Sequence, residues 1–370
     1  MIIKNIRDTF KTYDFTVVLC ALIASVTGLV FIYSATKNMG SFRYMAIQTC
    51  SMIIGFVFMY LITKIDYEDI ADSWKTISII CIAMLILVLI IGQGRDATGT
   101  RGWIRFGPVG IQPAELAKIG FIITFSKHLS NIEDDLNKIS NVIALMFHFF
   151  VPVGLILLQP DTGTALVFTF IFISMLFVAG IYWRYIIAGF VFFAAFSVVA
   201  WNFLLNNIQK ARFFAFLDPE SAAGTYGYHV IQSKIAVGSG KFFGKGILKG
   251  IQTQLGILPE KHTDFIFAVI GEEAGFVICI GLVIALFALV LRSVSIGKDA
   301  KSSTGTYMCV GVASMWLFHI FENIGMTIGL VPVTGIPLPF VSYGGSSVIT
   351  NYIAVGLVLC VYVRRNGVNF

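Results

Sequence analysis

Long apolar segments, separated by short polar ones, run along most of this chain. Most of them are close to the roughly 17 to 25 residues that an α-helix needs to cross a bilayer. The pattern predicts about ten transmembrane helices, at residues 15–33, 44–63, 76–91, 113–125, 142–158, 164–180, 185–205, 265–291, 307–330 and 346–363. We therefore expect an all-α, polytopic membrane protein that forms a single integral-membrane domain over residues 1–370.

The composition agrees with this pattern. Hydrophobic residues make up 57% of the chain and charged residues only 12%, and the mean hydropathy is strongly positive, which excludes an ordinary soluble domain. The six cysteines lie inside apolar segments without paired spacing, which argues against a disulfide framework and a zinc site. Because the basic residues are dispersed among the spans, we expect no nucleic-acid partner.

The charges outside the spans predict the orientation. Lys4, Arg7 and Lys11 precede the first span, which is too long for the apolar core of a cleaved signal peptide. Lys and Arg are more frequent in the short loops on the side of the N-terminus than in those opposite, which indicates the cytoplasmic side. Since ten spans return the chain to the same side, both termini are expected in the cytoplasm.

The long loop between the seventh and eighth spans, residues 206–264, is then extracytoplasmic and has a basic, glycine-rich composition. Within it Tyr228, Ile231 and Ile235 recur at helical spacing, which predicts a helix lying along the membrane surface. Lys234 and Lys245 are candidates to bind a phosphate-bearing ligand. The alternative is that each lysine belongs to an ordinary solvated face with its stem along the apolar surface.

A densely charged segment, residues 256–264, leads directly into the eighth span and brings Glu260, His262 and Asp264 to the membrane boundary. One interpretation is structural: Thr263 or Asp264 caps the next helix by accepting hydrogen bonds from its first N–H groups. The other is chemical: Asp264 is a general base beside a basic, water-accessible loop. A helix N-terminus next to Asp264 would lower its pKa.

Ionisable residues also occur inside the predicted spans, as the pairs Glu115 and Lys118, His319 and Glu322, and Glu272 and Glu273. An unpaired charge at that depth costs several kcal/mol, so partners one helical turn apart are expected to pair. The pairs either fix helix packing or line a polar cavity reached from outside.

Smaller signals mark close approaches and turns. Asp161 precedes the sixth span and is a candidate N-cap for it. Gly271 and Gly275 lie near the helical face of Asp264, where small residues admit a close neighbour. The proline-rich loop at 331–347 is expected to form an irregular cover or cavity wall rather than a helix.

Several blocks together resemble the SEDS family (shape, elongation, division and sporulation), in particular its RodA branch. They read GWI at 102–104, QPAELAK at 112–118, QPDTGT at 159–164, GYH at 227–229 with QS at 232–233, LPEKHTDFIF at 258–267, and PFVSYGGSS at 339–347. The stretch PVTGIPLP at 332–339 is more similar to RodA than to FtsW. The blocks stand in the order of the family and span nearly the whole chain.

The resemblance implies a ten-helix glycosyltransferase of the bacterial cell membrane that polymerises lipid II into peptidoglycan at the outer face during elongation and shape maintenance. It would work beside a class B penicillin-binding transpeptidase. The essential aspartate of the family falls on Asp264, the functionally important tryptophan on Trp103, and the intramembrane acid and base on Glu115 and Lys118.

This chemistry fits the residues. Asp264 would deprotonate the 4-hydroxyl of an incoming lipid II, which then attacks the anomeric carbon of the growing chain with inversion to a β-1,4 bond. Undecaprenyl diphosphate leaves, and positive charge stabilises it. Candidates for that charge are Lys234, Lys245, Arg101 and a divalent cation, Mg or Mn. Glu260 and His262 are further candidates for substrate binding; no organic cofactor is expected.

Two functions of other classes compete with polymerisation. The intramembrane charged pairs are also typical of a transporter, here a lipid II flippase. Transport needs no base at the outer surface, so the residues around Asp264 argue against it. A scaffold that only recruits the transpeptidase would tolerate changes at Asp264 and Trp103.

Overall fold

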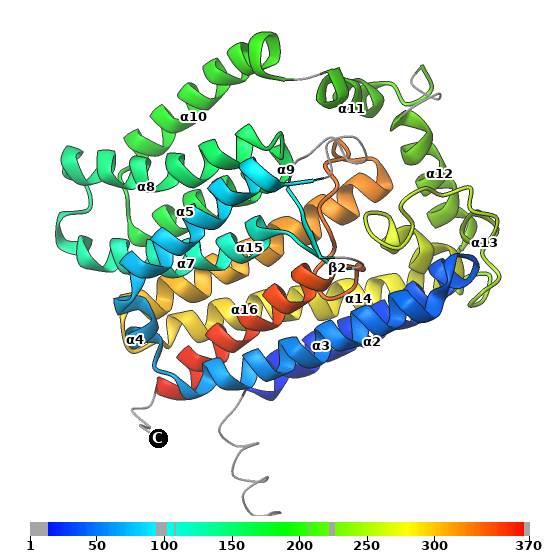
Figure 1. The fold of residues 1–370 in the computed structure, drawn as a ribbon, viewed down its shortest axis with the longest axis horizontal. Helices are drawn as coiled ribbons and strands as arrows, with labels where there is room; N and C mark the ends of the chain where they lie inside the picture. The colour runs from blue at the N-terminus through cyan, green and yellow to red at the C-terminus, as the bar shows by residue number, and fades with distance from the viewer. Residues whose placement is uncertain (1–13, 94–101, 107–108, 206, 222–225, 366–370) are drawn as a thin grey trace, which may run out of the picture.

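The computed structural model describes residues 14–93, 102–106, 109–205, 207–221 and 226–365. Its core is a bundle of long helices that run side by side (Figure 1). These are α2 (Phe15–Thr36), α3 (Ser41–Lys64), α5 (Trp74–Ile91), α7 (Pro113–Asn131), α8 (Ile139–Leu158), α9 (Thr162–Ala179), α10 (Trp183–Val199), α14 (Ile266–Lys298), α15 (Ser303–Ile328) and α16 (Gly345–Arg364).

Nine helices of the described residues are long and apolar enough to cross a membrane. The tenth long helix, α7, has 19 residues but carries Glu115, Lys118 and Lys127, so it is less apolar than the others. It packs inside the bundle against α5 and α15, and it continues well beyond residue 125, where the predicted fourth span ends. The predicted all-α, polytopic membrane fold is confirmed.

Helix ends follow the local chemistry of the sequence. Asp14 and Ser302 accept hydrogen bonds from the first turns of α2 and α15. Asp161 caps α9 through a 2.9 Å hydrogen bond from the Thr164 N–H, as predicted. Shorter elements join the long helices: η1 (Lys37–Met39), α4 (Tyr67–Asp72), η2 (Glu133–Asp135) and a π-helical turn, η3 (Ala200–Leu204).

Contacts are most extensive between α3 and α16 and among α2, α14 and α15, where the largest buried side chains include Trp316 and Tyr352. In contrast, α10 lies at the edge of the bundle (Figure 1), and most of its described apolar side chains are exposed. Such a surface suits contact with lipid chains.

The loop at 206–264 is largely structured. It contains α11 (Asn207–Leu217), α12 (Tyr226–Ser239) and α13 (Ile251–Gln254), which gather at one end of the bundle (Figure 1). Helix α12 covers the predicted helical spacing and packs against α14 and α15 through Val230, Ser233 and Ala236. Its position relative to a membrane surface stays a prediction.

Helix α14 is interrupted at Gly275, where φ is 76°, although its apolar sequence predicts a continuous span. The loop after α12 inserts at this break. Phe276 N–H donates to the Lys241 carbonyl (2.9 Å), and Lys245 N–H donates to the Glu272 carbonyl (3.0 Å). A Cβ on Gly275 would lie 2.3 Å from the Gly244 nitrogen, so the predicted close approach at the small residues is confirmed, with backbone as the neighbour.

Candidate active site

Asp264 lies in the turn before α14. That helix has Phe265 at its N-cap position, so neither Thr263 nor Asp264 caps it and the structural interpretation is wrong. The Asp264 carboxylate instead faces the proline-rich loop: its Oδ2 lies 3.3 Å from where a Cβ on Gly335 would stand. Gly335 has φ 80°, a conformation that glycine adopts without strain.

The environment of Asp264 raises the pKa of its carboxyl to about 6. Burial is the main cause, and the negative charge of Glu260 adds to it, while the positive charge of Arg212 acts in the opposite direction. The expected lowering by a helix N-terminus is therefore wrong, because desolvation outweighs it. An aspartate with this pKa is largely ionised at neutral pH and is a stronger base than an exposed one.

Two loops are fastened together around Asp264. Asn323, fully buried on α15, donates to the backbone carbonyls of Asp264 (2.9 Å) and Ile336 (2.8 Å). Ser342 Oγ donates to the Thr263 carbonyl at 2.7 Å, and Tyr343 N–H donates to the His262 carbonyl at 2.9 Å. These bonds fix the backbone of Asp264 against the proline-rich loop.

The proline-rich loop also carries a second carboxylate contact. Thr334 Oγ1 donates to Glu322 Oε1 at 2.8 Å, and Arg212 Nη1 on α11 donates to the Thr334 carbonyl at 3.5 Å. Residues 332–338 form neither helix nor strand, as predicted for an irregular cover. The loop thus brings Arg212 and Glu322 to the surroundings of Asp264.

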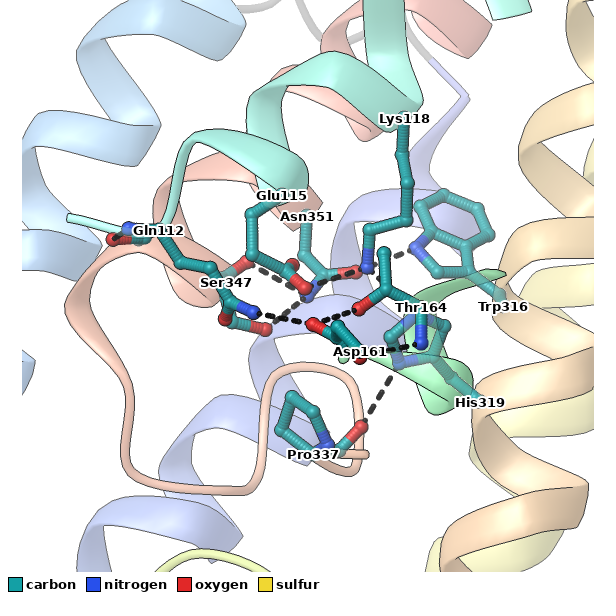
Figure 2. Close-up of polar contacts among 11 residues, drawn as sticks. Gln112, Glu115, Lys118, Asp161, Thr164, Trp316, His319, Pro337, Ser347 and Asn351 are labelled. Atoms are coloured by element: carbon teal, nitrogen blue, oxygen red, sulfur yellow. Dashed lines mark hydrogen bonds and ion pairs between the residues drawn. The ribbon is translucent and has the colours of Figure 1, made fainter. Parts of the chain in front are cut away.

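A second cluster surrounds Lys118, which is 1% exposed (Figure 2). Its Nζ lies 2.6 Å from Glu115 Oε1, so the predicted pair is confirmed, and 2.8 Å from His319 Nε2. Because an ammonium can only donate, His319 accepts at Nε2 and donates from Nδ1 to the Pro337 carbonyl at 3.1 Å. His319 and Glu322 therefore bind different partners rather than each other.

Asp161 connects this cluster to the loop before α7 (Figure 2). Gln112 Nε2 donates to Asp161 Oδ2 at 3.2 Å, and Thr164 Oγ1 donates to the same oxygen at 2.9 Å. A Cβ on Gly163 would stand 3.3 Å from atoms of Thr334, so the start of α9 touches the loop that also borders Asp264. Both clusters thus contact the proline-rich loop.

Trp103 directly precedes a short antiparallel hairpin, β1 (Ile104–Phe106) and β2 (Val109–Ile111), and pairs with Gln93 in a single β-bridge. Its half-buried ring lies against Gly110, 3.0 Å from where a Cβ would stand. Ser346 Oγ ties the hairpin to α16, accepting from Gln112 N–H (3.1 Å) and donating to the Gly110 carbonyl (3.2 Å). The hairpin is thereby held beside Asp161. Arg101 lies outside the described residues.

Four residues predicted to bind substrate lie in different parts of the structure. Lys245 Nζ forms a 3.0 Å ion pair with the buried Glu272, and Lys234 lies over Gly329 at the C-terminal end of α15. Glu260 is exposed, with φ 43°, and His262 packs against the rings of both Tyr44 and Tyr343. Of these four, Glu260 acts on Asp264 electrostatically. Their binding to a substrate stays a prediction.

Comparison with known proteins identifies the family. The family model described as "cell cycle protein", which covers FtsW, RodA and SpoVE, matches residues 14–367. The chain belongs to this FtsW/RodA/SpoVE family. The peptidoglycan glycosyltransferase MrdB of Escherichia coli K12 is 36% identical over 353 residues, which cover 95% of this chain and 94% of the relative. A probable peptidoglycan glycosyltransferase FtsW of Geobacter metallireducens is 34% identical over 372 residues, 98% of each chain.

Solved structures of the family share the fold. A chain from a peptidoglycan synthase complex, described as coordinating polymerization and crosslinking, superposes with a TM-score of 0.81 at 28% identity and covers 96% of this chain and 99% of its own. The rod shape determining protein RodA of Thermus thermophilus gives a TM-score of 0.72 at 27% identity, covering 96% of this chain and 98% of that one.

For this member of the FtsW/RodA/SpoVE family, sequence reasoning missed three site residues. Arg212 is only one of several basic residues in the composition of the long loop, and Thr334 is only part of the PVTG block. His229 shares the charged neighbours Glu260 and Arg212 with Asp264, and its ring centroid is 6.1 Å from that of Phe265; burial lowers its pKa while the Glu260 charge raises it. Two of these residues, His229 and Thr334, lie in the GYH and PVTG blocks. The hydropathy pattern does not point to any of the three.

Proposed function

We propose that this chain is the peptidoglycan glycosyltransferase that joins lipid II units into β-1,4 glycan strands at the outer membrane face during cell elongation. The observation that carries the proposal is the Asp264 carboxyl, a base with a pKa of about 6 that faces an irregular loop next to Arg212. The names and the extent of similarity of the relatives support the same activity.

In the proposed reaction, Asp264 takes the proton of the 4-hydroxyl of the acceptor sugar. The oxygen forms a bond to the anomeric carbon of the lipid-linked chain, and the bond from that carbon to the diphosphate oxygen breaks. The electron pair leaves with undecaprenyl diphosphate, whose low basicity makes a general acid unnecessary. Asn323 supports this step by fixing the Asp264 backbone.

Positive charge is needed where the diphosphate leaves. Arg212 is the cation that stands closest to this role, because its charge acts on both Asp264 and His229 and its planar guanidinium suits phosphate oxygens. Lys234, Lys245 and Arg101 remain further candidates. The buried Lys118 already contacts Glu115 and His319, which favours a role in shaping the site over binding a phosphate.

A divalent cation would enter with the substrate. Among the described residues, no three His, Cys, Asp or Glu side chains lie close enough together to hold a metal ion by themselves. Magnesium commonly binds through one or two carboxylates plus the phosphates of a substrate. Asp264, Glu260 and Glu322 are carboxylates of the described residues near the proposed diphosphate position, so they are candidates to share such a cation.

The surroundings of the reaction follow from this proposal. The outer face is the end of the bundle that carries Asp264, α11 and α12, and both termini lie in the cytoplasm, as the distribution of basic residues indicates. A class B penicillin-binding transpeptidase is the proposed partner. The similarity to a chain from a complex that coordinates polymerization and crosslinking supports this partner.

A lipid II flippase is the second candidate, favoured by the buried Glu115, Lys118 and His319 in the membrane-embedded bundle. A flippase function would give the raised pKa of Asp264 no role. Polymer formation from lipid II in liposomes with magnesium or manganese, with and without the transpeptidase, separates the two functions.

Asp264→Asn should lower polymer formation by about 10² to 10⁴-fold, the range for removing a general base. Asp218→Asn is the matched control, because Asp218 is an exposed carboxylate of the same loop that only caps a turn at Ser221. Full turnover by Asp264→Asn would refute the base. Transport of labelled lipid II without any polymer would instead support the flippase.

A further inference from the structure

A cavity of about 330 Å³ lies between α5, α7 and α8 and shares no lining residue with the candidate active site. Its lining extends from Trp74 to Leu85 on α5 and from Ala117 to His128 on α7. Eleven residues of an α-helix span about 17 Å. A sphere of the same volume would have a smaller diameter, so the cavity is elongated along the helices. This shape suits an extended chain rather than a compact ligand.

The walls of the cavity are mostly apolar, and one side faces outward. On α8, the lining residues Ala144 and Phe147 are exposed at the surface of the bundle. On the opposite side, α5 and α7 are in tight contact, since a Cβ on Gly120 would stand 2.2 Å from Cys81 Sγ. The cavity therefore opens toward the lipid-facing surface and is closed toward the interior.

A column of stacked rings runs from the first residue of α5 into this cavity. The Trp74 ring stacks on His128 with centroids 6.3 Å apart, and His128 stacks on His148 at 5.2 Å. The two histidine Nδ1 atoms are 3.0 Å apart, and His148 Nε2 lies 3.0 Å from Thr124 Oγ1. These contacts use three of the four ring nitrogens and leave Nε2 of His128, among the described residues, for a ligand.

A lysine lies next to the Trp74 end of the cavity. Lys75 Nζ lies 5.7 Å from the Trp74 ring centroid and has no acidic partner within ion-pair distance in the described part of the chain. The nearby carboxylate of Asp72 is neutralised by Lys127 at 2.6 Å. Since Trp74 begins α5 directly after α4, this part of the cavity lies at the end of a membrane-spanning helix, where lipid phosphates are found.

We propose that the cavity binds one acyl chain of an anionic glycerophospholipid, with its phosphate at Lys75 and His128. The chain would run along α5 and α7 past Thr124 toward Leu85. A lipid chain leaves an apolar phase when it enters the cavity, so it gains packing contacts rather than hydrophobic transfer energy, while an anionic headgroup gains about fivefold in affinity from a nearby lysine. The elongated shape therefore selects a chain, and Lys75 supplies the preference for an anionic lipid.

Native mass spectrometry of the full chain tests this site, with phosphatidylglycerol and phosphatidylcholine as separate probes. Ala144→Phe and, from the opposite wall, Ser78→Phe place a ring in the cavity and should each weaken phosphatidylglycerol retention by at least about fivefold, because the ring takes the space in which the chain makes its packing contacts. Ala194→Phe on the exposed face of α10 is the matched control and should bind as the wild type does.

Lys75→Gln should lower phosphatidylglycerol binding about fivefold, the effect of one exposed charge, and leave phosphatidylcholine binding unchanged. Melting temperatures of all variants show whether each is folded. Unchanged phosphatidylglycerol retention in both folded cavity variants would overturn the proposal. So would retention of undecaprenyl phosphate, but not phosphatidylglycerol, at the site that Ala144→Phe blocks, because the occupant would then be an isoprenoid chain.

Discussion

Two carboxylates near the start of α14 have opposite surroundings. Glu272 is fully buried and accepts from Lys245 Nζ, from the N–H groups of Gln252 and Thr253 and from the Thr253 hydroxyl. Asp264, eight positions earlier, is half-buried, and desolvation raises its pKa. A carboxylate saturated with hydrogen bonds stabilises the fold, whereas one that is desolvated with few donors keeps its basicity for chemistry.

Glu273 extends the structural side of this comparison. It accepts hydrogen bonds from Ser34 Oγ at 2.6 Å and from Gln254 Nε2 at 2.9 Å, and so joins α2 and α13 to α14. Together the two glutamates hold the inserted loop at the break in α14. The carboxylates of this segment thus differ in the number of hydrogen-bond donors around them.

The sharpest test of this division is Glu272→Gln. The amide places an NH₂ group where donors now converge and leaves Lys245 without its partner, so we expect a loss of about 3 kcal/mol in the free energy of unfolding. Thermal unfolding in detergent measures it. Glu260→Gln, at an exposed glutamate, is the matched control and should unfold as the wild type does. Equal stability of Glu272→Gln and wild type would contradict a structural role.

The pH dependence of polymerisation tests the role of Asp264 as a base. Asp264 must be ionised to act as a base, and its pKa is about 6. Polymerisation should therefore fall about tenfold per pH unit as the pH drops below 6. A profile that stays flat down to pH 5 would show that another group takes the proton.

The raised pKa of Asp264 also affects the free energy of unfolding. A rise in pH increases the expected activity but lowers this contribution to stability. Folding raises the pKa of Asp264, so the folded state binds its proton more tightly than the unfolded chain does, and this contribution is present at low pH and lost as the pH rises from about 4 to 6. The Asp264→Asn variant has no carboxyl to ionise at this position, so it does not lose this stability as the pH rises. At pH 7.5 the variant should be at least as stable as the wild type while it is inactive.

The sequence predicts the fold well because hydrophobic segment length determines which helices can span a bilayer. It also predicts the Glu115 and Lys118 pair and the Asp161 cap, since both depend on neighbours within one helical turn. It fails where partners are distant in the chain. The contact of Asp264 with Gly335, and that of Lys118 with His319, depend on tertiary packing, which local spacing does not encode.

The break in α14 was missed for a related reason. Gly275 lies in an apolar run whose hydropathy is that of a continuous helix, and only the inserted loop, with its own glycines, satisfies the backbone groups that the break exposes. The same insertion explains the partner of Lys245. Its charge suggested a phosphate ligand, but the loop backbone brings it to Glu272.

The smallest expected effect concerns Thr334, the hydroxyl donor to the buried Glu322. Thr334→Val keeps the shape of the side chain and removes the donor, which should cost about 1 to 2 kcal/mol in the free energy of unfolding. Thr334→Ser keeps the hydroxyl and should retain most of that stability. If the valine and serine variants unfold alike, the bond to Glu322 contributes nothing, and Glu322 then belongs with Asp264 among the carboxylates that are not held for structure.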